Sequence, residues 1–226
     1  MDISIQHGPG NAAARVDLSP GDSIVAEGGA MISMSAGVSI TTEARKRGQG
    51  GLFGAIKRLA SGESFFINTF TAGQSGGSVD LAATLAGDMQ AIEMDLSTNL
   101  IVQSGSYVCS EPGLKIDLGW TGFKSLFAKE GLFWLNISGS GKLVINSFGA
   151  IFPIDIDGEY VVDTGHIVAF DETLDYSLSK AGKSWVSSFL GGEGFVCRFK
   201  GTGSVWCQSH NSPGFGKRIG PMLKPR

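Results

Sequence analysis

The sequence predicts a single all-β domain made of three internal repeats, with short helical segments between strands. Three observations lead to this prediction: alternating apolar stretches, two motifs that each recur three times, and 34 glycines in 226 residues. Glycine at roughly twice its usual share, beside Val, Ile and Phe, is typical of short strands joined by tight turns. The hydrophobic fraction of 42 % and the formal charge of −3 exclude a disordered chain.

Alternating apolar residues indicate one half-buried strand near the start of each repeat. The stretches are Ala14-x-Val16-x-Leu18, Ile92-x-Met94-x-Leu96 and Ile154-x-Ile156. Because successive side chains of a strand point to opposite faces, the intervening acidic side chains should be exposed. We place the repeats at about 10–88, 89–150 and 151–210, within one compact domain that spans residues 1–210.

A Val-x-x-Gly motif follows each of these strands. Its glycines are Gly28, Gly105 and Gly165, and apolar residues follow each motif. We interpret these glycines as repeated structural positions in turns.

A second motif places one glutamate in each repeat, at Glu63, Glu130 and Glu193. We interpret these side chains as structural acceptors of backbone N–H groups in a turn. The alternative is that the three carboxylates bind a ligand or cation.

Apolar residues at helical spacing precede each glutamate. They are Ile56, Leu59 and Ala60 in the first repeat, Phe123, Leu126 and Phe127 in the second, and Val186, Phe189 and Leu190 in the third. Spacing of i, i+3 and i+4 makes one apolar face, so each repeat is expected to contain a short amphipathic helix.

Glycine-rich segments follow each second motif and are expected to form hairpin turns. They are Ala72–Gly77, Gly139–Gly141 and Gly201–Gly203. The first contains Gly73-Gln74-Ser75-Gly76-Gly77, which matches the G-x-S-x-G pattern of serine hydrolases. That pattern requires a following helix, whereas Ser78–Leu81 is expected to be a strand, so we interpret the segment as a turn.

A basic and apolar segment in the first repeat is the candidate contact with a membrane or a partner. Its members are Arg45, Lys46, Arg47, Leu52, Phe53, Ile56, Lys57 and Arg58. Basic amphipathic segments bury apolar side chains in a membrane interface while their cations meet lipid phosphates. The alternative is a loop helix that packs on its own sandwich.

Residues 211–226 are expected to form a flexible basic tail. The tail contains four Lys or Arg residues, three prolines and no acid. Nucleic acid is not an expected partner, because the sequence pI is about 5.6 and no nucleic-acid-binding motif is present.

The cysteines and histidines predict neither a disulfide framework nor a metal site. Cys109, Cys197 and Cys207 are expected to be reduced thiols; the alternative is a disulfide between the last two across a hairpin. The three histidines lack metal-ligand spacing, and no cofactor motif is recognised. No signal peptide or membrane-spanning segment is recognised, so we expect a cytoplasmic protein that can lie at the periphery of the inner membrane.

The chain resembles the bacterial relatives of the altered-inheritance-of-mitochondria protein twenty-four family, a family of unknown function. The resemblance covers about residues 5–210 and rests on Gly62–Phe70, Gly131–Phe133 and Gly192–Cys197. It implies three repeats like subunits of the trp RNA-binding attenuation protein. Each would be a short β-sandwich or shortened double-stranded β-helix, and the three would form a pseudo-trimer. The fungal members are mitochondrial and tied to inner-membrane organisation.

Together these observations favour a non-enzymatic scaffold or interaction protein, associated with a membrane and forming homo-oligomers. No set of nucleophile, base and acid is discernible, so no catalytic residue is predicted. The alternative is a small-ligand or RNA-binding module that uses clefts between the repeats.

Overall fold

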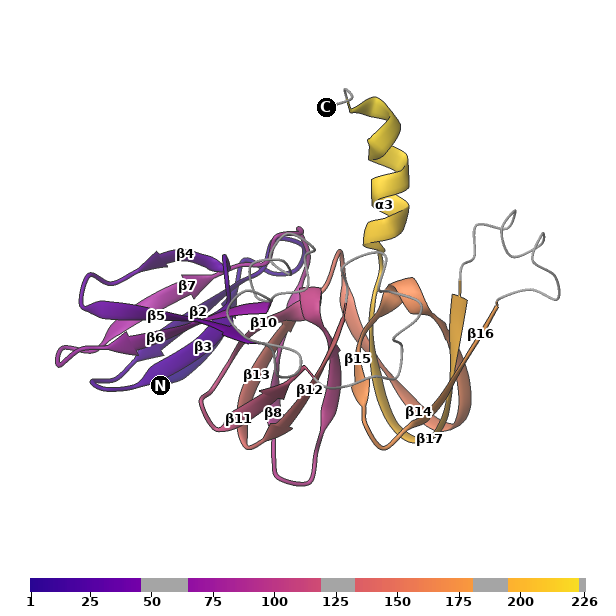
Figure 1. Cartoon of the computed structure of the whole chain (residues 1–226), viewed down its shortest axis with the longest axis horizontal. Helices are drawn as coiled ribbons and strands as arrows, with labels where there is room; N and C mark the ends of the chain where they lie inside the picture. The colour runs from indigo at the N-terminus through magenta and orange to yellow at the C-terminus, as the bar shows by residue number, and fades with distance from the viewer. Residues whose placement is uncertain (46–64, 119–132, 181–194, 224–226) are drawn as a thin grey trace, which may run out of the picture.

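The computed structural model describes residues 1–45, 65–118, 133–180 and 195–223. Within these ranges the protein is mostly β, with three antiparallel sheets and one short C-terminal α-helix (Figure 1). The sheets have the strand orders β1-β2-β7-β4, β5-β6-β3-β10-β13-β8 and β11-β12-β9-β15-β17-β14, with β16 also paired to β17.

The strands fall into three sets in chain order. Set one follows β1 (Asp2–Gln6) and contains β2 (Ala13–Leu18), β3 (Ser23–Glu27), β4 (Met31–Met34), β5 (Val38–Arg45), β6 (Phe65–Ala72) and β7 (Gly77–Leu81). Set two contains β8 (Met89–Met94), β9 (Leu100–Gln103), β10 (Tyr107–Ser110), β11 (Leu114–Asp117), β12 (Trp134–Gly139) and β13 (Gly141–Asn146). Set three contains β14 (Ile151–Asp163), β15 (Ile167–Asp171), β16 (Asp175–Lys180) and β17 (Phe195–Gln208).

The three sets share one pairing scheme. In set one, β7 lies between β2 and β4, and β6 lies between β3 and β5. Set two repeats this arrangement with β13 and β12, and in set three the single long strand β17 takes the place of both. A β-bulge recurs at the same point, at Ile32 in β4, Val108 in β10 and Val168 in β15.

The Val-x-x-Gly motifs occupy the turns that lead into β4, β10 and β15. In sets two and three the turns are short 3-10 helices, η1 (Ser104–Ser106) and η2 (Thr164–His166). The prediction is one residue out of register in set one. There the N–H of Gly28 donates to Phe66 O at 2.8 Å, as the N–H of Ser104 donates to Phe133 O at 2.8 Å. Gly29 is therefore the counterpart of Gly105, although Gly29 has a positive φ, of 96°, and Gly105 does not.

Backbone pairing joins set one to set two and set two to set three at equivalent residues. Ala26 in β3 pairs with Cys109 in β10, and Val102 in β9 pairs with Ala169 in β15. The sets lie side by side in a row in Figure 1, with β4 in the first set and β14 in the last. A closed pseudo-trimer needs a third junction, and the strands that the structure describes form none between the first and third sets.

In sets one and two the glycine-rich segments are corners between sheets, and in set three the segment lies within one strand, so none is the hairpin turn that the sequence predicts. Strand β12 pairs with β9 and β11, whereas β13, directly after it, pairs with β8 and β10. Gly139 makes this corner with φ of 114°, and a Cβ there would lie 2.4 Å from Gly113 O. In set three the chain bends at Gly201, φ of 125°, without leaving β17. Positive φ without a side chain explains why glycine occupies these points.

Each set has its own apolar core, and each core includes residues from the neighbouring set. Val108 and Val144 of set two join the first core, and Ile67 of set one joins the second. The predicted strand pattern is confirmed at Ala14, Val16 and Leu18, which are buried.

The strand predicted from Ile92, Met94 and Leu96 ends before Leu96 in the structure. Leu96 is 86 % exposed because β8 ends at Met94. Asp95 then accepts bonds from the backbone N–H and hydroxyl of Ser97, at 2.9 and 2.6 Å, which closes a turn.

The three cysteines are free thiols, as expected, and all are buried. Cys197 and Cys207 lie on the same strand, β17, and pair with Val162 and Phe152 of β14. They do not face each other across a hairpin, so the alternative of a disulfide between them is wrong. Burial raises the pKa of the Cys197 thiol to about 12 and that of Cys207 to about 11.

The segment predicted as a flexible tail contains the helix α3 (Ser212–Ile219), followed by η3 (Gly220–Met222). Its start is specified locally. The Asn211 side chain accepts a hydrogen bond from the N–H of Gly214 at 2.6 Å, and Pro213 occupies the first turn. Both features favour a helix start. In the part of the chain that the structure describes, no helix is long and apolar enough to cross a bilayer.

Candidate functional site

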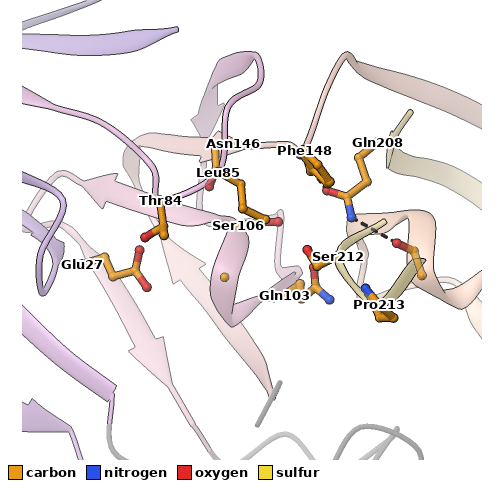
Figure 2. A pocket seen from close by; sticks show the side chains of 12 residues that line it. Glu27, Thr84, Leu85, Gln103, Ser106, Asn146, Phe148, Gln208, Ser212 and Pro213 are labelled. Carbon is orange, nitrogen blue, oxygen red and sulfur yellow. Dashed lines mark hydrogen bonds between the residues drawn. The ribbon is translucent and has the colours of Figure 1, made fainter. Parts of the chain in front are cut away.

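A cleft of about 340 Å³ lies where the turns of the three sets come together. Figure 2 shows Glu27 and Thr84 of set one on one side of it, Ser106 of set two in the middle, and Gln208 of set three on the other side. The polar side chains that line the cleft are Glu27, Thr84, Gln103, Ser106, Asn146, Gln208 and Ser212. The cleft is thus built from equivalent parts of successive sets.

Two amides hold the turns in place. Asn146, at the end of β13, donates to the carbonyls of Gly105 and Ser106 at 3.3 and 3.2 Å in the amide orientation that satisfies both of its ends. Gln208, at the end of β17, donates to Gly165 O at 3.0 Å and accepts from the N–H of Phe148 at 2.9 Å. Because both side chains are buried and bonded, they are part of the wall and fix its shape.

Glu27 is the acidic side chain that lines the cleft. In the described part of the chain, its carboxylate has no hydrogen bond or ion pair, although Glu27 is only partly exposed. Burial raises the pKa of Glu27 to about 7, because the loss of hydration disfavours the charged carboxylate. A buried carboxylate without a partner is costly to the fold, and its position in a cleft makes it a candidate ligand-binding group.

Helix α3 begins at the rim of the cleft, where Ser212 and Pro213 line the wall. His166 Nδ1 donates to Gln208 O at 2.7 Å, and His166 Nε2 accepts from the Asn211 side chain at 3.1 Å. The ring of Phe215 packs against that of Phe148 at a centroid distance of 5.3 Å. The base of the helix is therefore fixed to the cleft, while the rest projects away from the sheets (Figure 1).

The repeated glycines have different outcomes. Gly105 and Gly165 line the cleft, and Gly28 lies next to Glu27, which does. A Cβ at Gly28 would lie 2.9 Å from the Cβ of Phe66, so close packing also requires a glycine there.

Most of the other predicted site residues lie outside the described part of the chain. Glu63, Glu130 and Glu193 lie outside the described residues, as do Lys46, Arg47, Leu52, Phe53, Ile56, Lys57 and Arg58 and all three predicted amphipathic helices. Arg45 ends β5, but its side chain is not described. The G-x-S-x-G segment leads into β7, which confirms its interpretation as a turn.

Sequence reasoning missed Glu27, Asn146 and Gln208. The signal was present, because Glu27, Gln103 and Asp163 each directly precede a turn. Asn146 and Gln208 are each the last residue of a returning strand. Their convergence depends on strand pairing between sets. Among the residues that the structure describes, no three His, Cys, Asp or Glu side chains are grouped as metal ligands would be.

A family profile, a curated protein and a solved structure each match most of this chain. The sequence profile of the family described as mitochondrial biogenesis AIM24 matches residues 3–210. An uncharacterized protein of Streptococcus pyogenes serotype M6 is 31 % identical over 202 residues, which cover 87 % of this chain and 80 % of that protein. A crystal structure of a Streptococcus pyogenes protein superposes with a TM-score of 0.79 at 27 % identity and covers 98 % of this chain and 99 % of that one.

Proposed function

Because the chain belongs to the mitochondrial biogenesis AIM24 family, we propose that it is a non-enzymatic scaffold that docks on an anionic membrane surface. The body of the scaffold is a domain of three tandem β-sandwich repeats at about 10–88, 89–150 and 151–210. The shared pairing scheme and the recurring bulges support this division. In a bacterial cell the surface would be the cytoplasmic face of the inner membrane.

The observation that carries the proposal is the amphipathic character of α3 and η3. Phe215 and Ile219 lie one turn apart in α3, which places them on one face of the helix. Met222 ends η3, and Leu223 follows it. Phe215, Met222 and Leu223 are exposed, as are Lys217 and Arg218 in the last turn of the helix. Exposed apolar side chains next to cations are typical of helices that lie in a membrane interface.

The basic and apolar segment of set one supports the same proposal from the sequence. It adds Arg45, Lys46, Arg47, Lys57 and Arg58 to the cations that can meet lipid phosphates. One acyl chain or one short amphipathic segment gives weak and reversible membrane binding, so two such segments would act together.

Vesicle flotation tests the proposal. The protein should float with vesicles of phosphatidylglycerol and phosphatidylcholine at low salt and remain behind with phosphatidylcholine alone. Each cation near an anionic surface contributes about 1 kcal/mol, so the double variant Lys217→Gln/Arg218→Gln should bind roughly 30-fold more weakly. The variant Lys115→Gln/Lys200→Gln, at exposed strand positions, makes the same change in net charge and should bind like the parent.

The proposal fails if the parent does not bind anionic vesicles. The assignment of membrane contact to α3 fails if Lys217→Gln/Arg218→Gln and Lys115→Gln/Lys200→Gln bind vesicles with the same affinity, because binding would then reflect net charge alone. A variant at Lys46, Arg47, Lys57 and Arg58 separates the contribution of the first-set segment from that of the helix.

A second candidate function is the binding of a small cationic ligand in the cleft. The Glu27 carboxylate, which has no bonded partner among the described residues, favours it. An amine or guanidinium group would neutralise this carboxylate and restore the pKa of Glu27 toward its ordinary value. Calorimetric titration with primary amines and guanidinium compounds tests it. Binding should rise between pH 6 and pH 8 and be lost in Glu27→Gln; equal binding by this variant would contradict the assignment.

A further inference from the structure

Two strand edges remain open at the ends of the row of strand sets. We call β4, Met31–Met34, the head edge and residues 160–162 at the end of β14 the tail edge. In the described part of the chain, β4 pairs only with β7, and β14 pairs only with β17. Each of these strands therefore presents one side of its backbone without a strand partner.

The equivalent edges inside the chain are covered. The head edge corresponds to β10 and β15, because all three strands follow the turn and contain the same bulge. Every residue of β10 is buried, whereas every residue of β4 is exposed. Ile32 is 58 % exposed, while its counterparts Val108 and Val168 are 1 % and 0 % exposed. The difference arises because β3 covers β10 and β9 covers β15.

The tail edge shows the same contrast. It corresponds to β9, whose residues are all buried beside β15. Tyr160 and Val161 are 48 % and 43 % exposed, whereas Leu100 and Ile101 at the same points of β9 are fully buried. An apolar surface that is covered at every internal repeat is thus left uncovered at each end.

The head edge lacks the charges that protect other edge strands from pairing, and the tail edge is an uncharged stretch of a strand that carries charges elsewhere. Proteins place Lys, other charges or Pro on edge strands to prevent association. The remaining strands at sheet ends carry such charges: Asp2 in β1, Glu43 in β5, Glu93 in β8, Lys115 in β11 and Asp175 in β16. The head edge is Met-Ile-Ser-Met, and β4 contains no charge or proline. The tail edge is Tyr-Val-Val, an uncharged stretch of β14 between Glu159 and Asp163.

From these observations we propose that the head edge of one chain pairs antiparallel with the tail edge of a second copy. The internal junctions give the register. Val102 pairs with Ala169 and Ile101 with Phe170, so Val162 should pair with Ser33 and Val161 with Met34. Each copy keeps one free edge of each kind, so the contact is heterologous and propagates head to tail into a ring or a filament.

One chain does not satisfy its own edges, because the head and tail edges lie at opposite ends of the row (Figure 1). The proposal deepens the scaffold role stated above by naming the partner as a second copy. It does not involve the membrane contact of α3, so its test needs no vesicles and its failure is distinguishable from failure of membrane binding.

Cysteine cross-linking between two variants tests the register. Met34→Cys and Val161→Cys change exposed side chains, and the three native cysteines are buried. Directly paired residues on antiparallel strands have Cα separations that suit a disulfide. The mixture of the two variants should form a disulfide-linked dimer under mild oxidation, and neither variant alone should do so.

The mixture of Met34→Cys and Tyr160→Cys is the matched control. A shift of one residue directs the two side chains to opposite faces of the sheet, so about tenfold less dimer is expected. Cross-linking of Met34→Cys with itself would show a symmetric contact and overturn the proposal. Equal cross-linking by both mixtures would overturn the register and with it the proposal.

Sedimentation measures the assembly without cysteines. The mass of the parent should rise with concentration above that of the 23.6 kDa monomer. Val161→Lys should weaken association at least about tenfold, because a lysine on an edge strand opposes pairing. Ile40→Lys, which changes a 40 % exposed residue on the charged edge strand β5, should associate like the parent. A parent that stays monomeric at all concentrations overturns the proposal.

Discussion

The substitution Glu27→Gln should change the pH dependence of stability in a defined direction. Burial in the cleft raises the pKa of Glu27 from 4.5 to about 7, so the folded protein holds this proton more tightly than the unfolded chain. Between pH 4.5 and pH 7 the native state therefore binds more protons, and the free energy of unfolding falls as the pH rises. The stability that this bound proton contributes is fully present below pH 4.5 and is lost as the pH rises through about 7.

The magnitude follows from the size of the change in pKa. A rise from 4.5 to about 7 corresponds to about 3 kcal/mol, an upper value because Glu27 is partly exposed. Glutamine keeps the shape and removes the charge, so Glu27→Gln should be close to the parent at pH 4 and more stable by up to about 3 kcal/mol at pH 8.

Urea unfolding at pH 4 to 8, followed by tryptophan fluorescence, provides the assay. The difference in free energy of unfolding between variant and parent should rise through this range and level off above pH 7. Glu43→Gln, at an exposed position of β5, controls for the substitution itself. A difference between Glu27→Gln and the parent that stays constant from pH 4 to pH 8 would refute the argument from burial.

Three other substitutions test the packing. Gly139→Ala should lower the free energy of unfolding by about 2 kcal/mol or more, because Gly139 has φ of 114° and a Cβ there would lie 2.4 Å from Gly113 O. Its control is Gly10→Ala, which should cost less, because Gly10 has φ of 98° but nothing lies within 4 Å of the added Cβ. Tyr107→Phe should cost about 1 kcal/mol in chemical denaturation, since its hydroxyl contacts a β3 carbonyl oxygen at 3.1 Å across the first junction. Asn211→Ala should cost about 1 kcal/mol of helix stability and raise amide exchange in the first turn of α3 without changing exchange in the sheets.

The strand content of the protein could be predicted because its signals are local. Alternation at Ala14, Val16 and Leu18 identifies a buried strand face, and it succeeds because side-chain direction follows position in the strand. The same signal fails at Leu96, because β8 ends at Met94 and a turn closed by Asp95 and Ser97 follows. The local preference of Asp for turns outweighs the apolar pattern there.

The candidate site could be predicted only in part. Gly105 and Gly165 were identified as repeated positions and do line the cleft, while the polar groups around them were missed. Glu27 looks like an ordinary surface residue in sequence, since it follows an alternating strand. The rise in its pKa comes from burial in a cleft that Thr84 and Leu85 of the same set and turn residues of set two also line.

At Gly139 and Gly141 the sequence located a turn correctly but predicted the wrong pairing of the strands on either side. The sequence shows that the chain must turn there, because only glycine combines positive φ with close backbone approach. It does not show whether the two flanking strands pair with each other. That choice depends on β8 and β9, which lie about 40 residues earlier and offer separate partners.

The sequence by itself thus determined the β class, the family and the points at which the chain must turn, since each depends on short-range periodicity or on recurring motifs. The tertiary structure decided which strands pair across sets, that the sets form an open row, and that three turns meet around Glu27. The physical reason is that strand pairing uses backbone groups common to all residues. Its partners are therefore selected by the burial of side chains from distant segments, which the local sequence does not specify.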